Sequence, residues 1–570
     1  MTDQTPMTPT PERAAPIRSG DASPHWPAGF DAHLEFPAGN AFLNLDRSAS
    51  RWPDRPALFY YGQTTLYADL RARVEALAGF LQSLGVAPGD RVLVDLQNSP
   101  QFVIAFHAIL RADAVVVPIN PMNTTEELEH YATDSGARIA IVGDELLDRF
   151  RPLMPRLIDR LIAAHYADAA PEVPEEHLPP VMQAPRAALH PATEIDFEAA
   201  IAIGHRPAPI TGCSEDVAVM PYSSGTTGKP KACMHHHSAV TFTAAAQAKW
   251  YGLSEQSVMT SFMPMFHVAG MQASMSAGLF AGAALVIMTR WDRDIIPDLF
   301  THHRVTWWSA APTMIVDVMA SDHFDPACLA HVQVLTGGGA AMPAAVALEL
   351  RKRYGLEFCE GYGLTETISA THINPTHRPK PQCLGLPIFD TRSIVVDPDS
   401  LEELPQGELG EILISGPQVM AGYWQRPEAT DETLITREGR VWLRTGDLGY
   451  VDEEGYFFIV DRLKRMISVS GFKVWPTECE NLLYRHPAVK ECCVISSPDP
   501  YRGETVKALI VLKPGQAEGV DARAITDFAR EHMAAYKVPR IVEFVDALPH
   551  SGTKKVDWRA LQHAEWKDRQ

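Results

Sequence analysis

Short apolar runs alternate with stretches of helical periodicity from about residue 41 onward. Three apolar runs predict buried strands: 92–96 (VLVDL), 114–119 (AVVVPI) and 138–142 (RIAIV). Between the first two runs, residues 100–112 carry apolar side chains at helical spacing and predict a helix. Thr124, followed by Glu127 three residues later, predicts a capping box that opens a second helix. This alternation predicts an α/β fold with a mostly parallel sheet covered by helices.

The pattern changes in the last part of the chain, after the very polar segment Asp461–Arg465. Strand-like runs at 492–496, 508–513 and 540–545 are interleaved there with helical stretches near 477–486 and 521–535. This arrangement predicts a small α+β domain. We therefore expect a loose N-terminal tail over 1–40, a large domain over 41–463 and a small C-terminal domain over 464–570.

Charge and composition exclude several function classes. The 570 residues contain 50 Lys and Arg against 70 Asp and Glu, a net charge of −20, which argues against non-specific binding of nucleic acid. The charge is uneven, because residues 465–570 carry +2 and the preceding part carries −22. The acidity therefore belongs to the large domain.

Targeting and membrane signals are weak. The first forty residues contain seven prolines and no apolar h-region, which indicates a loose tail and no signal peptide. No stretch reaches the ~18 uncharged apolar residues of a membrane span, and the segment that comes closest, 270–288, predicts a buried strand–helix segment. The eight cysteines form no CxxC pair, so we expect reduced thiols in a cytoplasmic protein without an integral membrane segment.

The densest chemical signal is the segment Tyr222–Lys231 (YSSGTTGKPK). Its glycines allow backbone N–H groups to approach a ligand, its hydroxyls donate hydrogen bonds and its lysines neutralise charge, which together suit a phosphate. The spacing is not that of a Walker A loop, and a polar turn between two strands is the alternative interpretation.

Five further clusters carry polar or acidic groups that suit ligand binding, although each alone also fits an ordinary turn or exposed loop. They are Thr336–Ala340 (TGGGA), Glu360–Thr367 (EGYGLTET), the imidazole of His267 after Met263–Phe266, Arg444–Asp447 (RTGD) and Leu548–Lys555 (LPHSGTKK). Glu366 is a hard oxygen ligand suited to Mg²⁺, and Asp447 follows a glycine turn from which it could accept both hydroxyls of a ribose.

The order of these motifs resembles the adenylate-forming superfamily, which includes acyl- and aryl-CoA synthetases, adenylation domains of peptide synthetases and luciferases. The resemblance covers roughly residues 41–560 and is strongest to bacterial fatty-acid–CoA ligases. It implies an ATP-dependent acid–CoA ligase with ATP, Mg²⁺ and coenzyme A as cofactors or co-substrates, and a small C-terminal domain that is mobile. It also allows a homodimer.

The resemblance implies a role for each motif residue. Phosphates of ATP would contact Ser223, Ser224, Gly225, Thr226, Thr227, Gly228, Lys229 and Lys231. The nucleotide would also be bordered by Gly338, Glu360, Gly361, Tyr362 and Gly363, with Tyr362 at the adenine. Thr365 would approach the α-phosphate, Glu366 would bind Mg²⁺, Asp447 and Arg462 would hold the ribose, and His267 would border the acid pocket.

The resemblance assigns the remaining roles to the small domain. Lys555 would be the catalytic lysine, although Lys554 stands where the family has glycine, so the assignment depends on alignment from Leu548. Lys464 would be the hinge, and Ser470, Gly471 and Lys473 would form the face that meets coenzyme A. Ala232 also departs from the family, which usually has glycine there.

The acid itself is less defined by the sequence. The segments that would line its pocket contain small and flexible apolar residues and no Arg or Lys, which favours an uncharged, medium- or long-chain fatty acid. An aryl or branched acid, or a carrier-protein thiol as acceptor, remains an alternative. A dinucleotide oxidoreductase would need a GxGxxG motif that is absent, and an inactive binding protein would be expected to lack Lys555, Glu366 or Asp447.

Overall fold

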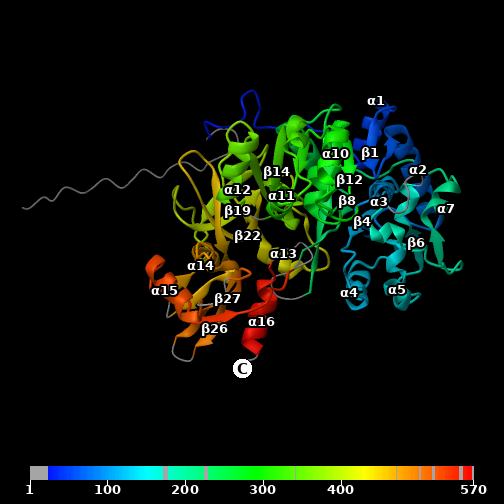
Figure 1. Cartoon of the computed structure of the whole chain (residues 1–570). Helices are drawn as coiled ribbons and strands as arrows, with labels where there is room; N and C mark the ends of the chain where they lie inside the picture. Colours follow the sequence, from blue (N-terminus) through cyan, green and yellow to red (C-terminus); the bar gives the residue numbers. More distant parts are fainter. Residues whose placement is uncertain are drawn as a thin grey trace, which may run out of the picture.

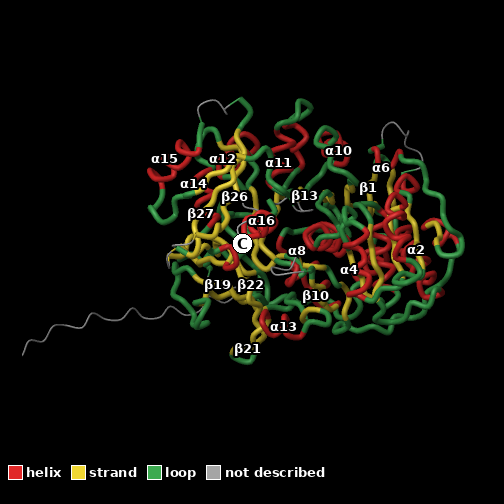
Figure 2. Tube along the Cα trace, turned by 90° about the horizontal axis from the view of Figure 1, so that it is seen from below, coloured by secondary structure: helices red, strands yellow, loops and turns green. Residues whose placement is uncertain are grey.

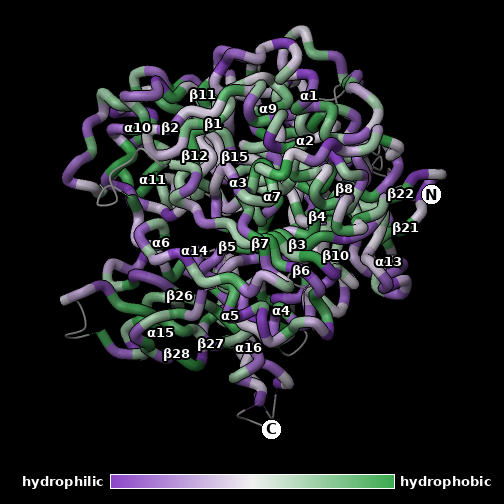
Figure 3. The backbone as a smooth tube through the Cα atoms, turned by 90° about the vertical axis from the view of Figure 1, so that its right-hand side faces the viewer, coloured by the Kyte–Doolittle hydropathy of each residue, from purple (hydrophilic) through white to green (hydrophobic). Residues whose placement is uncertain are grey.

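Two mostly parallel sheets with apolar side chains on both faces form the centre of the large domain (Figure 1). The computed structural model describes residues 23–170, 178–223, 229–339, 342–469, 472–499, 502–515, 520–550 and 556–567. Figure 3 shows the apolar character of the strands, which contrasts with the polar loops around them.

The first sheet is parallel from β15 to β1 and antiparallel at both edges. Its strands in spatial order are β17 (Leu386–Pro387), β16 (Ala370–Ile373), β15 (Phe358–Gly363), β14 (Val334–Gly338), β13 (Trp307–Ser309), β11 (Val258–Ser261), β12 (Ala284–Ile287), β1 (Pro56–Tyr60) and β2 (Gln63–Leu66).

The second sheet is parallel from β8 to β7, and β10 joins it in the antiparallel direction. Its strands in order are β20 (Gly422–Tyr423), β10 (Lys231–His236), β8 (Val217–Val219), β4 (Val115–Pro118), β3 (Arg91–Asp95), β5 (Ile139–Gly143), β6 (Arg160–Ala164) and β7 (Glu194–Asp196), with β9 (Tyr222–Ser223) also paired to β10. The predicted strands are confirmed in β3, β4 and β5.

Helices cover both faces of each sheet, as Figure 2 shows. Successive residues of β3 alternate between two cores: Val92 and Val94 belong to the core that the sheets share, and Leu93 belongs to the outer one. Such two-sided burial is typical of parallel sheets. The shared core also contains α1 (Phe42–Arg51), α2 (Tyr67–Ser83), α3 (Pro100–Arg111), α8 (His237–Trp250) and α9 (Ala277–Ala281). The outer faces carry α10 (Ile296–His303), α11 (Pro312–Met319) and α12 (Ala344–Glu349) on the first sheet and α4 (Thr125–Ser135) and α5 (Leu147–Phe150) on the second.

Several local predictions are confirmed. The Thr124 side chain accepts the N–H of Glu127, whose carboxylate accepts the Thr124 N–H in return, so the capping box opens α4. The predicted helix over 100–112 is α3. The segment 270–288 is largely buried, but there a π-helix (Ala269–Ser276) and α9 precede the strand β12.

A third sheet and a small α+β domain complete the chain. The third sheet is antiparallel and contains β18 (Arg392–Val396), β19 (Gly410–Ser415), β22 (Arg440–Val451), β21 (Leu434–Arg437) and β23 (Phe457–Arg462). The small domain contains β24 (Ile467–Val469), β25 (Phe472–Val474), β26 (Val489–Asp499), β27 (Gly503–Leu512), β28 (Ile541–Phe544), α14 (Pro476–Leu483), α15 (Ala522–His532) and α16 (Trp558–Lys567). It forms the orange and red lobe in Figure 1. The predicted fold class is confirmed. The remaining α-helices are α6 (Pro180–Gln183), α7 (Phe197–Ala202) and α13 (Pro427–Thr433).

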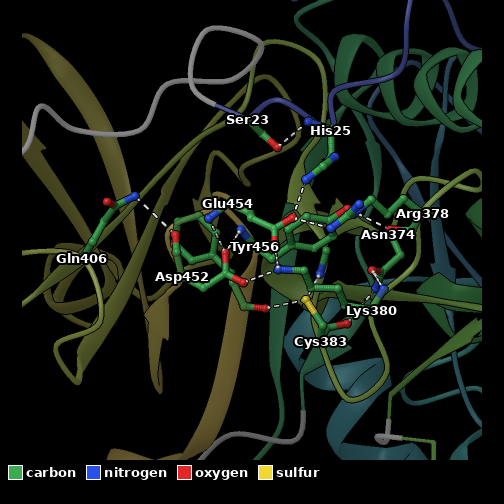
Figure 4. Close-up of polar contacts among 12 residues, drawn as sticks. Ser23, His25, Asn374, Arg378, Lys380, Cys383, Gln406, Asp452, Glu454 and Tyr456 are labelled. Carbon is green, nitrogen blue, oxygen red and sulfur yellow. Dashed lines mark hydrogen bonds and ion pairs between the residues drawn. The ribbon is translucent and has the colours of Figure 1, made fainter.

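Residues 23–40, which the sequence places in a loose tail, pack against the large domain. The Trp26 ring lies 5.2 Å from the Trp250 ring and 5.7 Å from the Phe389 ring, centroid to centroid. Figure 4 shows His25 beside Glu454, and the His25 Nε2 contacts the Glu454 carboxylate. The structure differs from the expectation here because aromatic burial outweighs the composition of the segment.

All eight cysteines are free thiols, as expected. Among the described residues, no helix has both the length and the apolar character of a membrane span.

Candidate active site

The carboxyl ends of β14 and β15 approach each other without intervening side chains. A methyl group added to Gly338 would lie 2.3 Å from the carbonyl oxygen of Gly361, its register partner on β15. A methyl group at Gly363 would lie 1.9 Å from the Ser369 carbonyl oxygen. Glycine is therefore required at 338 and 363 for backbone packing, whereas at Gly361 a Cβ would meet its nearest neighbour at 3.7 Å and fits.

Three predicted nucleotide-binding side chains meet beside these strands. Asp447 on β22 is fully buried, and its two carboxylate oxygens face the Arg462 Nε at 2.8 Å and the Tyr362 hydroxyl at 2.5 Å. Register places Arg462 directly opposite Asp447 on β23. Asp447 raises the pKa of the Arg462 guanidinium, and burial followed by the Asp447 charge raises the pKa of Tyr362. A buried carboxylate and a guanidinium group therefore lie side by side and offer both a hydrogen-bond acceptor and donors. Such a pair suits a polar ligand such as a ribose.

Thr365 and Glu366 lie on a short turn, η8 (Thr365–Thr367), directly after β15. The Glu366 Oε1 accepts a hydrogen bond from the Tyr423 hydroxyl at 2.8 Å, and its backbone carbonyl accepts the N–H of Met420 at 2.8 Å. The Thr365 carbonyl accepts from the His235 Nε2, also at 2.8 Å. The turn is therefore fixed to β10 and β20 of the second sheet.

The predicted phosphate segment is described at its two flanks. Ser223 on β9 pairs with Lys231 on β10, so the segment begins and ends on two antiparallel strands. The Lys231 Nζ lies 4.5 Å from the centroid of the Tyr423 ring, and Lys229 is exposed. Tyr423 thus contacts both Lys231 and Glu366.

Asp134, at the C-terminal end of α4, anchors this region. Its carboxylate accepts from the Tyr222 hydroxyl at 2.9 Å and from the Arg426 guanidinium at 2.6 Å, and its backbone carbonyl accepts from the Trp424 indole at 3.0 Å. Tyr222 begins the phosphate segment, and Trp424 and Arg426 directly follow Tyr423. The Asp134 carboxylate therefore joins the start of the phosphate segment to the segment that follows β20.

Cationic side chains of both domains converge on this place. Burial, then the nearby charges of Lys231 and Arg559, lower the pKa of Lys464. Burial and the charge of Arg462 lower the pKa of Arg559, on α16. Such an accumulation of positive charge is favourable where a polyanion binds. Lys464 lies on η9 (Leu463–Arg465), between the two domains.

Glu360 is a buried carboxyl group on β15. Its Oε1 accepts the backbone N–H groups of Met342 and Gln382, each at 3.1 Å, and burial raises its pKa to about 7. Its carbonyl oxygen accepts from Asn374, which begins the loop drawn in Figure 4; further along that loop Lys380 pairs with Asp452 and Glu454. The main role of the Glu360 carboxyl group is therefore to fix the backbone at Met342 and Gln382, because burial disfavours its charged form.

His267 lies in the loop between β11 and the π-helix. Its Nδ1 accepts the N–H of Ala269 at 3.3 Å. The Asn98 side chain fixes the same loop, because its amide nitrogen donates to the carbonyls of Ser261 and Met263 and its oxygen accepts the N–H of Met265.

Some predicted residues lie outside the described part of the chain: Ser224, Gly225, Thr226, Thr227, Gly228, Ser470, Gly471, Lys554 and Lys555. Lys473 lies on β25, and the model describes its backbone only. The antiparallel bridge between His550 and Val556 joins the two ends of the segment that contains Lys555.

The sequence interpretation missed Tyr423, His235, Asp134 and Asn98. None belongs to a phosphate, ribose or metal motif, and each acts on a residue far away in the sequence. Only the segment GYWQRPEAT (422–430), with its two aromatic residues next to a strand, offered a local signal.

Comparison with known proteins agrees with this geometry. The family model "AMP-binding enzyme" matches residues 45–424, and "AMP-binding enzyme C-terminal domain" matches 478–555. The chain is 34% identical to a long-chain-fatty-acid–CoA ligase of Bacillus subtilis, over 94% of this chain and 96% of the relative. It is also 34% identical to a feruloyl-CoA synthase of Amycolatopsis, over 90% of this chain and 96% of that protein.

Solved structures show the same architecture. ATP-bound MatB from Rhodopseudomonas palustris superposes with a TM-score of 0.82 at 27% identity, covering 93% of this chain and 99% of that one. The anthranilate CoA ligase AuaEII in complex with anthranoyl-AMP gives a TM-score of 0.81 at 26% identity, with 95% and 100% covered.

The fold and the site thus define a two-domain ligase of the adenylate-forming superfamily. The chain belongs to the AMP-binding enzyme family, as an AMP-forming acyl-CoA synthetase-type ligase.

Proposed function

We propose that this protein is an ATP-dependent acid–CoA ligase that converts a medium- or long-chain fatty acid into its coenzyme A thioester. The observation that carries the proposal is the meeting of the Asp447–Tyr362–Arg462 group with the Glu366 turn and Lys231, which come from three different sheets. Asp447 and Arg462 suit a ribose, Glu366 suits a metal ion bound to phosphate, and Lys231 suits the negative charge of a phosphate.

The reaction proceeds in two steps. The substrate carboxylate attacks the α-phosphorus of ATP, so that an acyl-adenylate forms and pyrophosphate leaves. The thiol of coenzyme A then attacks the acyl carbonyl, the thioester forms and AMP leaves. The first step is needed because a carboxylate has no good leaving group, whereas AMP is one.

The residues of the described site have distinct parts in this scheme. Asp447 and Arg462 would hold the ribose, with Tyr362 against the adenine, and Lys231 would balance phosphate charge near the loop 224–228. Thr365 would contact the α-phosphate. Positioning and electrostatic stabilisation are the main contributions in phosphoryl transfer.

Glu366 is the residue that would hold Mg²⁺. Its Oε1 accepts a hydrogen bond from the Tyr423 hydroxyl at 2.8 Å, which fixes the carboxylate at the end of the turn. The described chain contains no cluster of three or more His, Cys, Asp or Glu residues able to hold a metal ion. One carboxylate fits Mg²⁺ well, since this ion usually binds one or two carboxylates together with substrate phosphates. When bound, Mg²⁺ would neutralise charge on the phosphate oxygens.

Fatty-acid specificity is supported by the Bacillus relative and by the lining expected for the acid pocket. Trp308 is buried, and no Arg or Lys occurs in the segments 308–314, 336–342 and 360–364. The charge that does occur, on Glu360, is opposed by burial. The feruloyl-CoA synthase relative is equally similar, so an aryl acid is the competing substrate class.

A panel of C2–C16 and aromatic acids, assayed by pyrophosphate release and by thioester formation, tests the proposal. We expect the highest kcat/KM with C8–C16 acids, because each buried methylene contributes about 0.8 kcal/mol. A preference for aromatic acids would overturn the fatty-acid assignment and keep the reaction type. Absence of acid-dependent pyrophosphate release would overturn both.

A further inference from the structure

Two side chains of the paired strands β10 and β20 hold the turn that contains Glu366. Tyr423 on β20 donates its hydroxyl hydrogen to the Glu366 Oε1 at 2.8 Å. His235 on β10 donates from Nε2 to the Thr365 carbonyl at 2.8 Å. A carbonyl oxygen only accepts, so the Nε2 of this fully buried ring carries the proton.

Further contacts fix the positions of β10 and β20 relative to each other. Cys233 pairs with Tyr423 across the two strands, and the Trp424 N–H donates to the Ala232 carbonyl at 2.9 Å. The Lys231 ammonium sits over the Tyr423 ring, so the same ring supports a cation of the phosphate segment. Tyr423 is 6% exposed, so its ring is held by the surrounding packing.

We propose that Tyr423 and His235 are positioning residues that aim the Glu366 carboxylate and the Thr365 backbone at the metal–nucleotide complex. This inference rests on the proposed function. Because Tyr423 holds Oε1, it orients the whole Glu366 carboxylate, and His235 fixes the backbone of the same turn at Thr365. Partners that orient a metal-binding carboxylate in this way commonly affect metal affinity.

Metal binding measured without turnover tests the proposal. Mn²⁺ serves as the probe, and its binding to the full chain in the presence of α,β-methylene-ATP is followed by the electron paramagnetic resonance of free Mn²⁺. We expect Tyr423→Phe, which keeps the ring over Lys231 and removes one hydroxyl, to weaken Mn²⁺ binding by about tenfold. The Mg²⁺ concentration for half-maximal pyrophosphate release should rise in parallel, while kcat at saturating Mg²⁺ falls less.

His235 gives an independent pair of variants. His235→Leu removes the donor and should weaken Mn²⁺ binding, and His235→Gln, which retains a donor, should restore most of it. Tyr450→Phe is the matched control, because it removes a hydroxyl from a ring that stacks on the Phe458 ring, with 5.0 Å between the centroids.

The outcomes separate the two proposals. Unchanged Mn²⁺ affinity in Tyr423→Phe, or equal losses in His235→Leu and His235→Gln at unchanged melting temperature, would overturn the positioning role. Normal Mn²⁺ and nucleotide binding by the wild type without acid-dependent turnover would overturn the proposed function alone. Failure of the wild type to bind Mn²⁺ with the nucleotide would overturn the positioning role as well.

Discussion

Burial, more than any nearby charge, determines the acid–base behaviour of Glu360. Its pKa rises from the usual 4.5 to about 7, and the two backbone N–H groups that it accepts oppose this shift only in part. In the unfolded chain the group loses its proton near pH 4.5, and in the folded chain near pH 7. The folded state therefore binds the proton more tightly, so the contribution of Glu360 to stability is full below pH 4.5 and declines until about pH 7.

Glu360→Gln should remove this pH dependence, because the amide is neutral and still accepts both N–H groups. Each unit of raised pKa corresponds to about 1.4 kcal/mol. As the pH rises from 5 to 8 the wild type should lose stability and the variant should not, so the stability of the variant relative to the wild type should increase. Melting temperatures at the two pH values measure the gain, with the more exposed Glu357→Gln as control. The same pH dependence in the variant and the wild type would show that Glu360 is not the group responsible.

At the scale of the element, α4 connects the phosphate segment to the second sheet. Its capping box fixes the N-terminal end, and Asp134 near its C-terminal end accepts from Tyr222 and Arg426. The Asp134 side chain is 6% exposed, so its removal leaves the two donors without their acceptor.

Asp134→Ala should therefore raise the KM for ATP by about tenfold or more, since a hydrogen bond to a charged group contributes at least about 1.5 kcal/mol, with a smaller effect on the KM for the acid. Initial-rate kinetics with ATP and the acid varied in turn would measure the difference. Asp148→Ala provides the control, since that carboxylate is 91% exposed and pairs with Arg151 at the surface. Equal changes in both KM values would mean that Asp134 only stabilises the fold.

At the scale of the whole molecule, the junction between the two domains decides which groups face the nucleotide. Asp461, at the end of β23, accepts the N–H of Thr477 in α14 at 2.7 Å, so one carboxylate joins both domains. Lys464 follows in a 3₁₀ turn, where its charge interacts with Lys231 and Arg559. In this arrangement α16 lies toward the phosphate side of the large domain.

Lys464→Pro tests whether the domains must rotate between the half-reactions. Proline fixes φ at residue 464 and restricts the backbone of the preceding Leu463, so rotation of the small domain about this residue should be hindered. We expect pyrophosphate release in a single turnover to stay within about threefold of the wild type and thioester formation from preformed adenylate to fall by at least about tenfold. Lys464→Ala is the control, and equal rates of thioester formation in the two variants would contradict a hinge at this residue.

The sequence by itself determined the layers of the fold and most of the motif positions. Period-two and period-3.6 patterns are local, so the runs that became β3, β4 and β5 and the capping box of α4 were readable from neighbouring residues. The order of the motifs also indicated the family, because Asp447, Arg462 and Glu366 are marked by the residues beside them.

Only the tertiary structure decided which residues hold those motifs in place. Tyr423 lies 57 residues from Glu366 and His235 lies 130 residues from Thr365, and no local pattern links such partners. The N-terminal segment behaves in the same way, since its packing depends on Trp250 and Phe389 far along the chain. Burial, which raises the pKa of Glu360, likewise arises from the packing of distant segments and not from its sequence neighbours.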